Sequence, residues 1–367
     1  MLKYLNLKTE AFGLDISDLS LKIIKLKKSI HRGTRAFNLA SFGESEIKPG
    51  IIKEGEIKNE EKLAETIKEA IKKVKGEKIR TKYVVASLPE EKTFLQVIQM
   101  PKMAEEDLKS AVIYEAENYI PLPIEEVYLD SQIVPPLHNH LDHYDVLINA
   151  LPRKIIDSYL SSFKKAGLKP VVLEIESSAI SRALIKNETT ISPLLIIDLG
   201  ETRTSFIVFS GYALRFTSSI PISSQQFTEI ISKTLGKSLT EAEELKIQYG
   251  LEKKDKIGEK IFETLAPILS DLTEQIKKCL DYYQTHAGHE HLSANNKEVQ
   301  KVLLCGGGAN LKRLSHFLSN KLQIPVELVN PWINILTEPK KETPEMSFEK
   351  SLGFTTALGL ALRGIKQ

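Results

Sequence analysis

Two stretches of the sequence place an aspartate and small hydroxyl-bearing residues directly after an apolar run. In the first, AFGLDISDLSLKIIKLKK, residues 11–28, the polar side chains of interest are those of Asp15, Ser17, Ser20 and Lys22. In the second, LLIIDLGETRTSFIVF, residues 194–209, the corresponding residues are Asp198, Gly200, Thr202 and Thr204. A carboxylate at the mouth of a buried strand costs free energy unless something at that place requires it.

Both turns have the composition of a polyphosphate site. Backbone N–H groups reach a phosphate only where side chains are small, which favours Gly, Ser and Thr. Magnesium keeps several waters and is commonly positioned by one or two carboxylates. We therefore expect Asp15 and Asp198 to face each other across a cleft and to hold Mg²⁺ through water. The two sets of hydroxyl residues, with Gly200 and Lys22, would contact the phosphates from opposite sides.

A third turn, CGGGANLKRLSHFL at residues 305–318, follows another apolar run. Its glycines, Gly306, Gly307 and Gly308, would let the backbone approach a flat ligand, and we expect Asn310 to cap the next helix. A tight strand-to-helix turn alone needs no ligand. Together with the two aspartate turns, it favours a nucleotide site.

The elements that must position these turns repeat along the chain. Apolar spacing predicts strands at 37–46 and 83–88 and a helix at 60–74 in the first half. In the second half it predicts strands at 194–198, 205–209, 212–219 and 301–305, and helices at 224–235, 240–249 and 258–287. Between the halves, residues 89–167 show a strand–helix–strand–strand–helix pattern, which predicts an inserted subdomain. The fold class is therefore α/β with two lobes.

Composition narrows the function classes. The chain has 367 residues and a net charge of +2, so its charge gives no reason to expect nucleic-acid binding. Cys279 and Cys305 are the two cysteines, and their separation argues against a disulfide framework or a zinc site. No apolar run reaches the roughly 18 residues of a membrane span, and the N-terminus has no signal-peptide pattern, so we expect a cytoplasmic protein.

The order of the three turns resembles the actin-like ATPase superfamily, whose fold has duplicated ribonuclease H-like lobes. In that superfamily a Glu and a Lys three residues apart on a helix flank the ribose and base of ATP. Glu243 and Lys246 match that spacing. An ordinary ion pair on a solvated helix face would explain the same two residues.

A narrower resemblance covers almost the whole chain: the PilM family of type IV pilus assembly proteins. It is carried by EEDLKSAVIYEAENYIPLPIEEVYLDSQIV, by LLCGGGANLKRLSHFLSNKLQIPVELVNPW and by the closing ALGLALRG. The resemblance implies a first lobe (1–88, 168–190 and 351–367), a partner-binding inserted subdomain (89–167), a second lobe (191–222 and 300–350) and its helical subdomain (223–299).

The resemblance also implies a function. It implies an adaptor that binds ATP and Mg²⁺ between its lobes and captures the cytoplasmic N-terminal tail of PilN, an inner-membrane protein, beside residues 104–119 and 127–134. Contacts with pilus motor components and a homo-oligomer are left open. The alternatives are an FtsA-like filament-forming ATPase and a sugar-kinase-type phosphotransferase. The C-terminal segment, rich in Ala and Gly, predicts close packing on the first lobe rather than a membrane anchor.

The sequence departs from the family pattern at three places. Ser17 and Asp18 stand where relatives have Gly and small hydroxyl residues, Glu201 replaces a small residue, and Ser223 and Ser224 replace Gly-Gly. A carboxylate beside a polyphosphate repels it unless a cation compensates. Since no base or water-orienting residue is fixed by the sequence, with Glu201 as a speculative candidate, we expect at most a slow ATPase.

Histidines gather in two polar loops, HNHLDH at 138–143 and a second group formed by His286, His289 and His291. A zinc or copper site is the weaker interpretation, because a polar loop explains each group as well. Neither cysteine has a nucleophile context.

Overall fold

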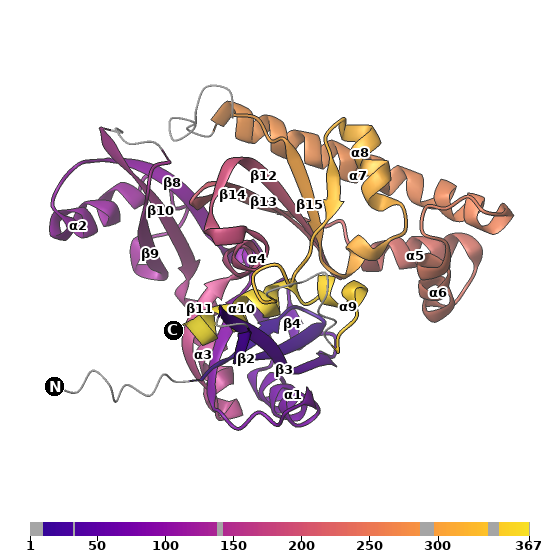
Figure 1. Ribbon diagram of the computed structural model, residues 1–367, viewed down its shortest axis with the longest axis horizontal. Coiled ribbons are helices and arrows are strands. Elements are labelled where there is room, and N and C mark those ends of the chain that lie inside the picture. The colour runs from indigo at the N-terminus through magenta and orange to yellow at the C-terminus, as the bar shows by residue number, and fades with distance from the viewer. Residues whose placement is uncertain (1–9, 32–33, 138–141, 287–296, 337–344, 367) are drawn as a thin grey trace.

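The computed structural model describes residues 10–31, 34–137, 142–286, 297–336 and 345–366. Two open sheets form the centres of two lobes, and a smaller sheet lies beside them (Figure 1). We call the lobe of the first aspartate turn the first lobe and that of Asp198 the second lobe.

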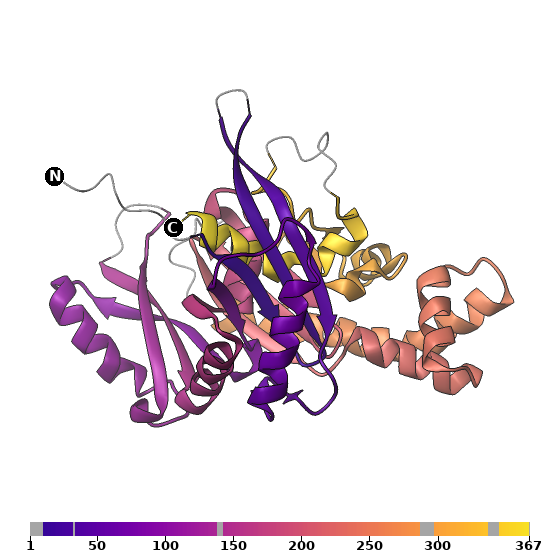
Figure 2. The same cartoon turned by 90° about the horizontal axis from the view of Figure 1, so that it is seen from below.

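The first lobe contains a six-stranded sheet in the order β11-β7-β1-β2-β3-β6. Its strands are β1 (Phe12–Ile16), β2 (Ser20–His31), β3 (Thr34–Glu46), β6 (Lys75–Gly76), β7 (Tyr83–Leu88) and β11 (Lys169–Ile175). Strands β1 and β2 are antiparallel and pair Asp15 with Lys22, whereas β1 and β7 are parallel. Strands β2 and β3 extend well past the rest of the lobe (Figure 2). A two-stranded ribbon, β4 (Ile52–Lys53) and β5 (Glu56–Ile57), follows β3.

Helices cover this sheet through apolar faces. Helix α1 (Glu60–Lys72) buries Leu63 and Ile67, and the Asn59 side chain caps it by accepting from the Lys62 N–H. The last helix, α10 (Thr355–Lys366), packs on β1 and on α4 (Glu176–Leu184). A Cβ added to Gly359 would lie 1.8 Å from the Ala179 carbonyl oxygen, so the two helix backbones are in direct contact. The prediction that the small residues of this segment serve close packing is confirmed.

The second lobe contains a five-stranded sheet in the order β14-β13-β12-β15-β16. Its strands are β12 (Thr190–Leu199), β13 (Thr204–Gly211), β14 (Ala213–Ile220), β15 (Lys301–Cys305) and β16 (Val326–Leu328). Its helices are α5 (Ser224–Leu235), α6 (Leu239–Tyr249), α7 (Lys256–His286), α8 (Leu314–Leu322), α9 (Phe348–Leu352) and the 3₁₀ turn η5 (Gly307–Asn310). Strand β12 runs antiparallel to β13 and parallel to β15, which places Asp198 opposite Cys305.

The inserted segment has the predicted order of elements. They are the turn η2 (Glu90–Lys92), β8 (Phe94–Pro101), α2 (Glu105–Ala116), the turn η3 (Ile124–Glu126), β9 (Val127–Val134), β10 (His143–Pro152) and α3 (Arg153–Ala166). Its three strands and α2 surround a core of their own that includes Ile98, Leu108 and Val146. Helix α3 instead packs against α1, so the segment is anchored on the first lobe.

The lobes are also joined away from the cleft. Helix α4 contacts strands of both large sheets, and the amide of Asn334 donates to the carbonyls of Arg182, Ala183 and Ile185 at the end of that helix. Backbone N–H of Phe37 on β3 donates to the Ile335 carbonyl. A hinge between the lobes would lie on the side of the molecule where these contacts are made.

Candidate nucleotide site

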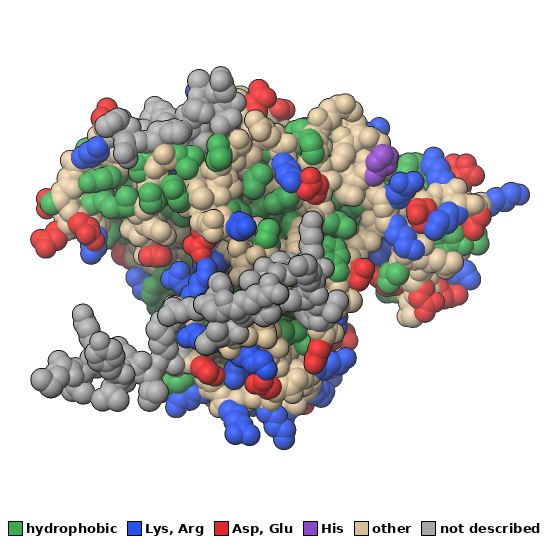
Figure 3. Space-filling model, in the orientation of Figure 1, with side chains coloured by type: hydrophobic (Ala, Val, Ile, Leu, Met, Phe, Trp, Pro, Cys, Tyr) green, Lys and Arg blue, Asp and Glu red, His purple; other side chains and the backbone are tan. Residues whose placement is uncertain are grey.

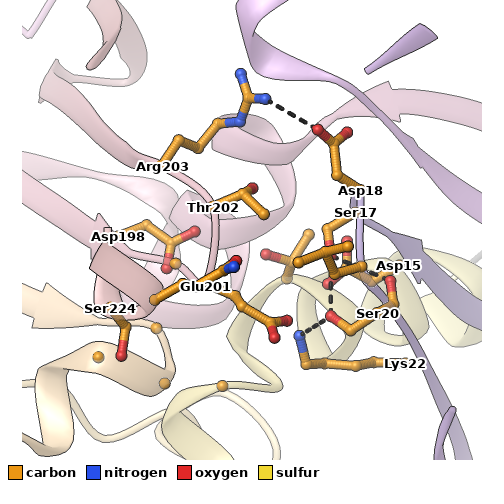
Figure 4. A pocket seen from close by; sticks show the side chains of 18 of the residues that line it. Asp15, Ser17, Asp18, Ser20, Lys22, Asp198, Glu201, Thr202, Arg203 and Ser224 are labelled. Atoms are coloured by element: carbon orange, nitrogen blue, oxygen red, sulfur yellow. Dashed lines mark hydrogen bonds and ion pairs between the residues drawn. The ribbon is translucent and has the colours of Figure 1, made fainter. Parts of the chain in front are cut away.

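A cleft of about 1070 Å³ lies between the two lobes. Its walls come from the β1–β2 turn, the β12–β13 turn, the β15–η5 turn and helices α4 and α6. Small-molecule sites span roughly 300–1,000 Å³, so the cleft is large enough for a nucleotide. Figure 4 shows the two aspartate turns on opposite sides of this cleft.

Most of the predicted site residues are brought together here, although they are spread over nearly the whole sequence. Those that line the cleft are Asp15, Ser17, Ser20, Lys22, Asp198, Gly200, Thr202, Glu243, Lys246, Gly306, Gly307, Gly308 and Asn310. Thr204 is not among the lining residues. Its side chain is fully buried, and its hydroxyl donates to the Ile222 carbonyl at 2.7 Å, so it holds β13 to the segment before α5.

The first turn is organised by its own hydroxyl groups. Ser17 N–H donates to the Ser20 carbonyl at 2.9 Å, and the two hydroxyls lie 2.9 Å apart. The Lys22 ammonium donates to Ser20 Oγ at 3.1 Å, which points a cation at the turn. Asp15 is fixed from behind, because Ser87 Oγ donates to its Oδ1 at 3.0 Å.

The two aspartates influence each other electrostatically. Burial raises the pKa of Asp15, while Lys22 and the Ser87 hydroxyl oppose that rise. Burial, and then the charge of Asp15, raises the pKa of Asp198 to about 6. A cation between two such carboxyls would be stabilised by both, and Mg²⁺ is commonly held by one or two carboxylates with water as its other ligands. The described residues contain no cluster of three or more Asp, Glu, His or Cys side chains suited to a metal, so protein ligands alone would not complete a coordination shell.

The glycine turn lies directly against the end of β12. Gly306 has a φ of 83°, and a Cβ there would meet Asp198 Oδ1 at 2.4 Å, whereas a Cβ on Gly307 would meet no atom within 4 Å. Gly307 therefore presents bare backbone to the cleft, as a flat ligand requires.

The expectation that Asn310 caps the following helix is wrong. Helix α8 begins at Leu314, and its N-cap residue is Arg313, which has a φ of 67°. The Asn310 amide donates to the carbonyls of Gly307 and Glu349, at 3.2 and 2.9 Å. It thereby ties the glycine turn to α9, because the turn continues as η5 before the helix starts.

Glu243 and Lys246 lie on α6 at the edge of the cleft and form an ion pair of 2.7 Å. The Lys246 ammonium is buried and donates to Ser224 Oγ and Thr228 Oγ1 on α5, at 2.9 and 2.8 Å. The Ser223 side chain caps α5 by accepting from the Gln226 N–H. Of the two serines that replace Gly-Gly, Ser223 thus caps α5, and Ser224 joins α5 to α6.

Among the cleft residues that the sequence interpretation missed are three charged ones, Glu176, Glu91 and Arg203. Glu176 opens α4, and burial together with the nearby acidic groups raises its pKa well above the usual value. Arg203 lies in the second aspartate turn itself, so its position alone was a usable signal. Nothing in the sequence around Glu91 or Glu176 indicates that either reaches the cleft.

The histidine loops give no metal site in the part of the chain that is described. His138, His140, His289 and His291 lie outside the described residues. His143 contacts Asp142 and Asp145, and His286 stacks on Tyr282. Both cysteines are buried, and burial raises their pKa, for Cys279 to about 12, which keeps the thiols protonated.

Comparisons with known proteins agree with this geometry. The family model described as type IV pilus assembly protein PilM matches residues 13–365. A solved PilM–PilN type IV pilus biogenesis complex contains a chain that is 29% identical, with a TM-score of 0.80 over 98% of this chain and 100% of that one. At 13% identity and a TM-score of 0.53, MreB5 of Spiroplasma citri, solved with AMPPNP bound, shares the fold over 98% of this chain and 97% of its own.

One curated relative is the cell division protein FtsA of Neisseria meningitidis serogroup B, 26% identical over 215 residues. The match covers 54% of this chain and 49% of that protein, so the chain spans about half the length of this relative. These similarities confirm the predicted actin-like ATPase fold. Among the described helices, none combines the length and apolarity needed to span a membrane.

Proposed function

This chain belongs to the PilM family of type IV pilus assembly proteins, and from that premise we propose that it is a nucleotide-responsive adaptor that docks the N-terminal tail of a PilN-like inner-membrane protein. The observation that carries the proposal is the match, over essentially both full chains, to PilM in a PilM–PilN complex. In this proposal the protein works on the cytoplasmic face of the inner membrane and is retained there by its partner.

The cleft is the proposed site for ATP and Mg²⁺. Asp15 and Asp198 would hold Mg²⁺ through water, and the bound ion would neutralise phosphate charge. Ser17, Ser20 and Lys22 would contact the phosphates from the first lobe, and Gly200 and Thr202 from the second. The Gly306–Gly308 turn and the edge of α6 would hold the nucleoside. The carboxyls with raised pKa values support this assignment, because a divalent cation would relieve their repulsion.

The inserted subdomain is the proposed docking surface. It exposes large apolar side chains: Tyr114 is 75% exposed on α2, and Tyr128 and Ile133 are each 39% exposed on β9. Figure 3 shows apolar side chains over this part of the molecule and mixed charges at the end formed by α5 and α6. Tyr128 is held in place, because it donates to Asp157 and carries the Arg153 guanidinium 4.4 Å from its ring centre. Aromatic side chains fixed in this way suit the capture of a peptide.

The decisive measurement is calorimetric titration with a synthetic cytoplasmic tail of a PilN-like protein, with and without Mg-ATP. We expect micromolar binding, and we expect Tyr114→Ala to weaken it by about tenfold, the loss typical of a contact residue worth ~1.4 kcal/mol. Tyr212→Ala, a matched exposed tyrosine in the second lobe at 44% exposure, should leave binding unchanged. Absence of binding by the wild-type chain would remove the adaptor function.

A filament-forming function is the second candidate, favoured by the partial similarity to FtsA. It predicts that Mg-ATP produces sedimentable polymers of the isolated chain. Polymer formation without peptide binding would select this candidate over the adaptor.

A further inference from the structure

A cluster of ion pairs joins the second aspartate turn, between β12 and β13, to the opposite side of the cleft. Arg203, in the β12–β13 turn, lies 2.8 Å from Glu91 Oε1 and 3.6 Å from Asp18 Oδ2. The three side chains are between 14% and 21% exposed, so water screens their attraction only in part. Figure 4 shows the Arg203–Asp18 pair spanning the cleft. Arg203 thus supplies the cation that the unexpected carboxylate of Asp18 requires.

The Asp18 carboxylate is held by backbone groups of the first lobe. Asp18 accepts the N–H groups of Glu54 and Gly55, at 2.7 and 2.9 Å. The Gly55 carbonyl in turn accepts the hydroxyl of Tyr159, a fully buried residue of α3. The second aspartate turn is therefore connected, through Asp18 and Gly55, to helix α3 of the inserted segment.

Glu91 provides a second connection. It belongs to η2, the turn directly before β8, which is the first strand of the inserted sheet. Its neighbour Glu90 is buried and accepts the backbone N–H and hydroxyl of Ser177 on α4, at 2.9 and 3.0 Å. The turn η2 is thus held to α4 through Glu90 and to the second aspartate turn through Glu91.

We propose that Arg203 is a switch that couples the nucleotide cleft to the inserted subdomain. Without nucleotide, Arg203 pairs with Asp18 and Glu91, and we call these two ion pairs the latch. A polyphosphate in the cleft competes with the two carboxylates for the guanidinium group and so opens the latch. Arginine pairs with phosphate as well as with carboxylate, through the same planar donors. Polyphosphate beside Asp18 also adds repulsion that weakens the latch. Release of Arg203 removes the ion pair between η2 and the β12–β13 turn, while the packing of η2 on β14 remains, and we expect the loosened η2 to affect β8 and α3. This inference rests on the proposed nucleotide site.

Hydrogen exchange on the full chain tests the latch, with Mg-ATP as the probe. In the wild-type chain, Mg-ATP should speed amide exchange in residues 90–101 and 153–166. Glu91→Gln should speed exchange in the same segments without nucleotide, by about fivefold or more, the usual lower end of a coupling between sites. Added Mg-ATP should then produce little further change. Asp18→Asn should act in the same direction.

Two controls keep the outcomes separate. Glu105→Gln removes an exposed carboxylate of the inserted subdomain that pairs with Lys109 at 3.7 Å, and it should leave exchange in both segments unchanged. Arg203→Lys keeps the charge without the planar fork, so the response to Mg-ATP should shrink. If the wild-type chain does not bind Mg-ATP, the proposed nucleotide site is wrong. If it binds Mg-ATP while Glu91→Gln exchanges like the wild type, the latch is wrong and the nucleotide site stands.

Discussion

Gly306 lies so close to Asp198 that a Cβ atom on the glycine would be 2.4 Å from the aspartate Oδ1. The register of β12 and β15 imposes this contact, because it pairs Asp198 with Cys305, the residue before the glycine. The second aspartate turn and the glycine turn are therefore one packed unit. A disturbance at either one displaces the other.

The two adjacent glycines should differ sharply on substitution. Gly306→Ala combines a φ of 83° with the clash at Asp198, so we expect it to lower the free energy of unfolding by about 1–3 kcal/mol and to weaken Mg-ATP binding. Gly307→Ala meets open space and should leave the melting temperature nearly unchanged. Thermal melts and nucleotide titrations of both variants check this. Equal melting temperatures for the two would contradict the geometry.

Asp198→Asn should make the chain more stable while weakening Mg-ATP binding. Since the pKa of Asp198 rises from 3.8 to about 6, the folded chain holds more protons than the unfolded chain between those values. Its contribution to the free energy of unfolding therefore falls as the pH rises through that window. At pH 7.5 the variant should be more stable by about 1–2 kcal/mol, allowing for solvent in the cleft.

At pH 4 the wild-type aspartic acid is protonated, so the two chains should unfold almost alike. Denaturant titrations of both chains at pH 4 and pH 7.5 test the sign of this stability difference. Wild-type affinity for Mg-ATP should rise from pH 5 to pH 7, because the Asp198 carboxylate that we propose as the cation ligand forms in that range. A variant that binds Mg-ATP as tightly as the wild type at pH 7.5 would place the metal elsewhere.

Glu176→Gln should reduce any phosphate release to the background rate while changing ATP affinity less than about twofold. Glu176 lines the cleft at the start of α4, where burial and neighbouring carboxyls raise its pKa well above the usual value, and a bound cation would bring that pKa back toward the range of a proton acceptor. Burial raises the pKa of Glu201 as well, so the position of the two side chains has to separate them. Glu201, the candidate suggested by the sequence, is exposed and points toward Lys22 (Figure 4). Glu201→Gln is therefore the control, and a steady-state phosphate assay compares them. Loss of release in the Glu201 variant alone would reverse the assignment.

Gly359→Leu should unfold the first lobe or destabilise it by ~3 kcal/mol or more, because a side chain there has no space against the Ala179 backbone. Gly364→Ala on the same helix is the control, since its Cβ would lie 3.1 Å or more from its neighbours and small shifts relieve that. Urea denaturation measures both. Similar midpoints for the two variants would show that α10 and α4 can separate at little cost.

The strands, and the turns that line the cleft, could be predicted because the residues that specify each of them lie close together in the sequence. Strand β7, helix α5 and strand β15 begin and end where the apolar spacing predicts. The predicted residues of the Asp15, Asp198 and glycine turns line the cleft, with Thr204 as the exception. Their residue types are constrained by strand burial and by backbone geometry, both of which are visible within a few positions.

Contacts that depend on the tertiary structure could not be predicted from such local patterns. Thr204 has the same residue type as Thr202, yet strand alternation turns its side chain inward to the Ile222 carbonyl. Asn310 precedes α8 by too many residues to cap it, because η5 intervenes. Glu91 reaches Arg203 from more than a hundred positions away in the chain. The subdomain boundaries stay a prediction, although α3 packs on α1 rather than on the inserted sheet.

The position of α10 constrains how the protein is made. Strand β1 is synthesised long before the helix that packs on it, which comes at residues 355–366. The face of the first-lobe sheet that α10 covers, which includes Ala11, Ile24 and Val85, therefore lacks part of its final packing until α10 has left the ribosome. A polypeptide interrupted before α10 would keep that apolar surface uncovered, which makes it a substrate for chaperones or proteases rather than a partly working adaptor.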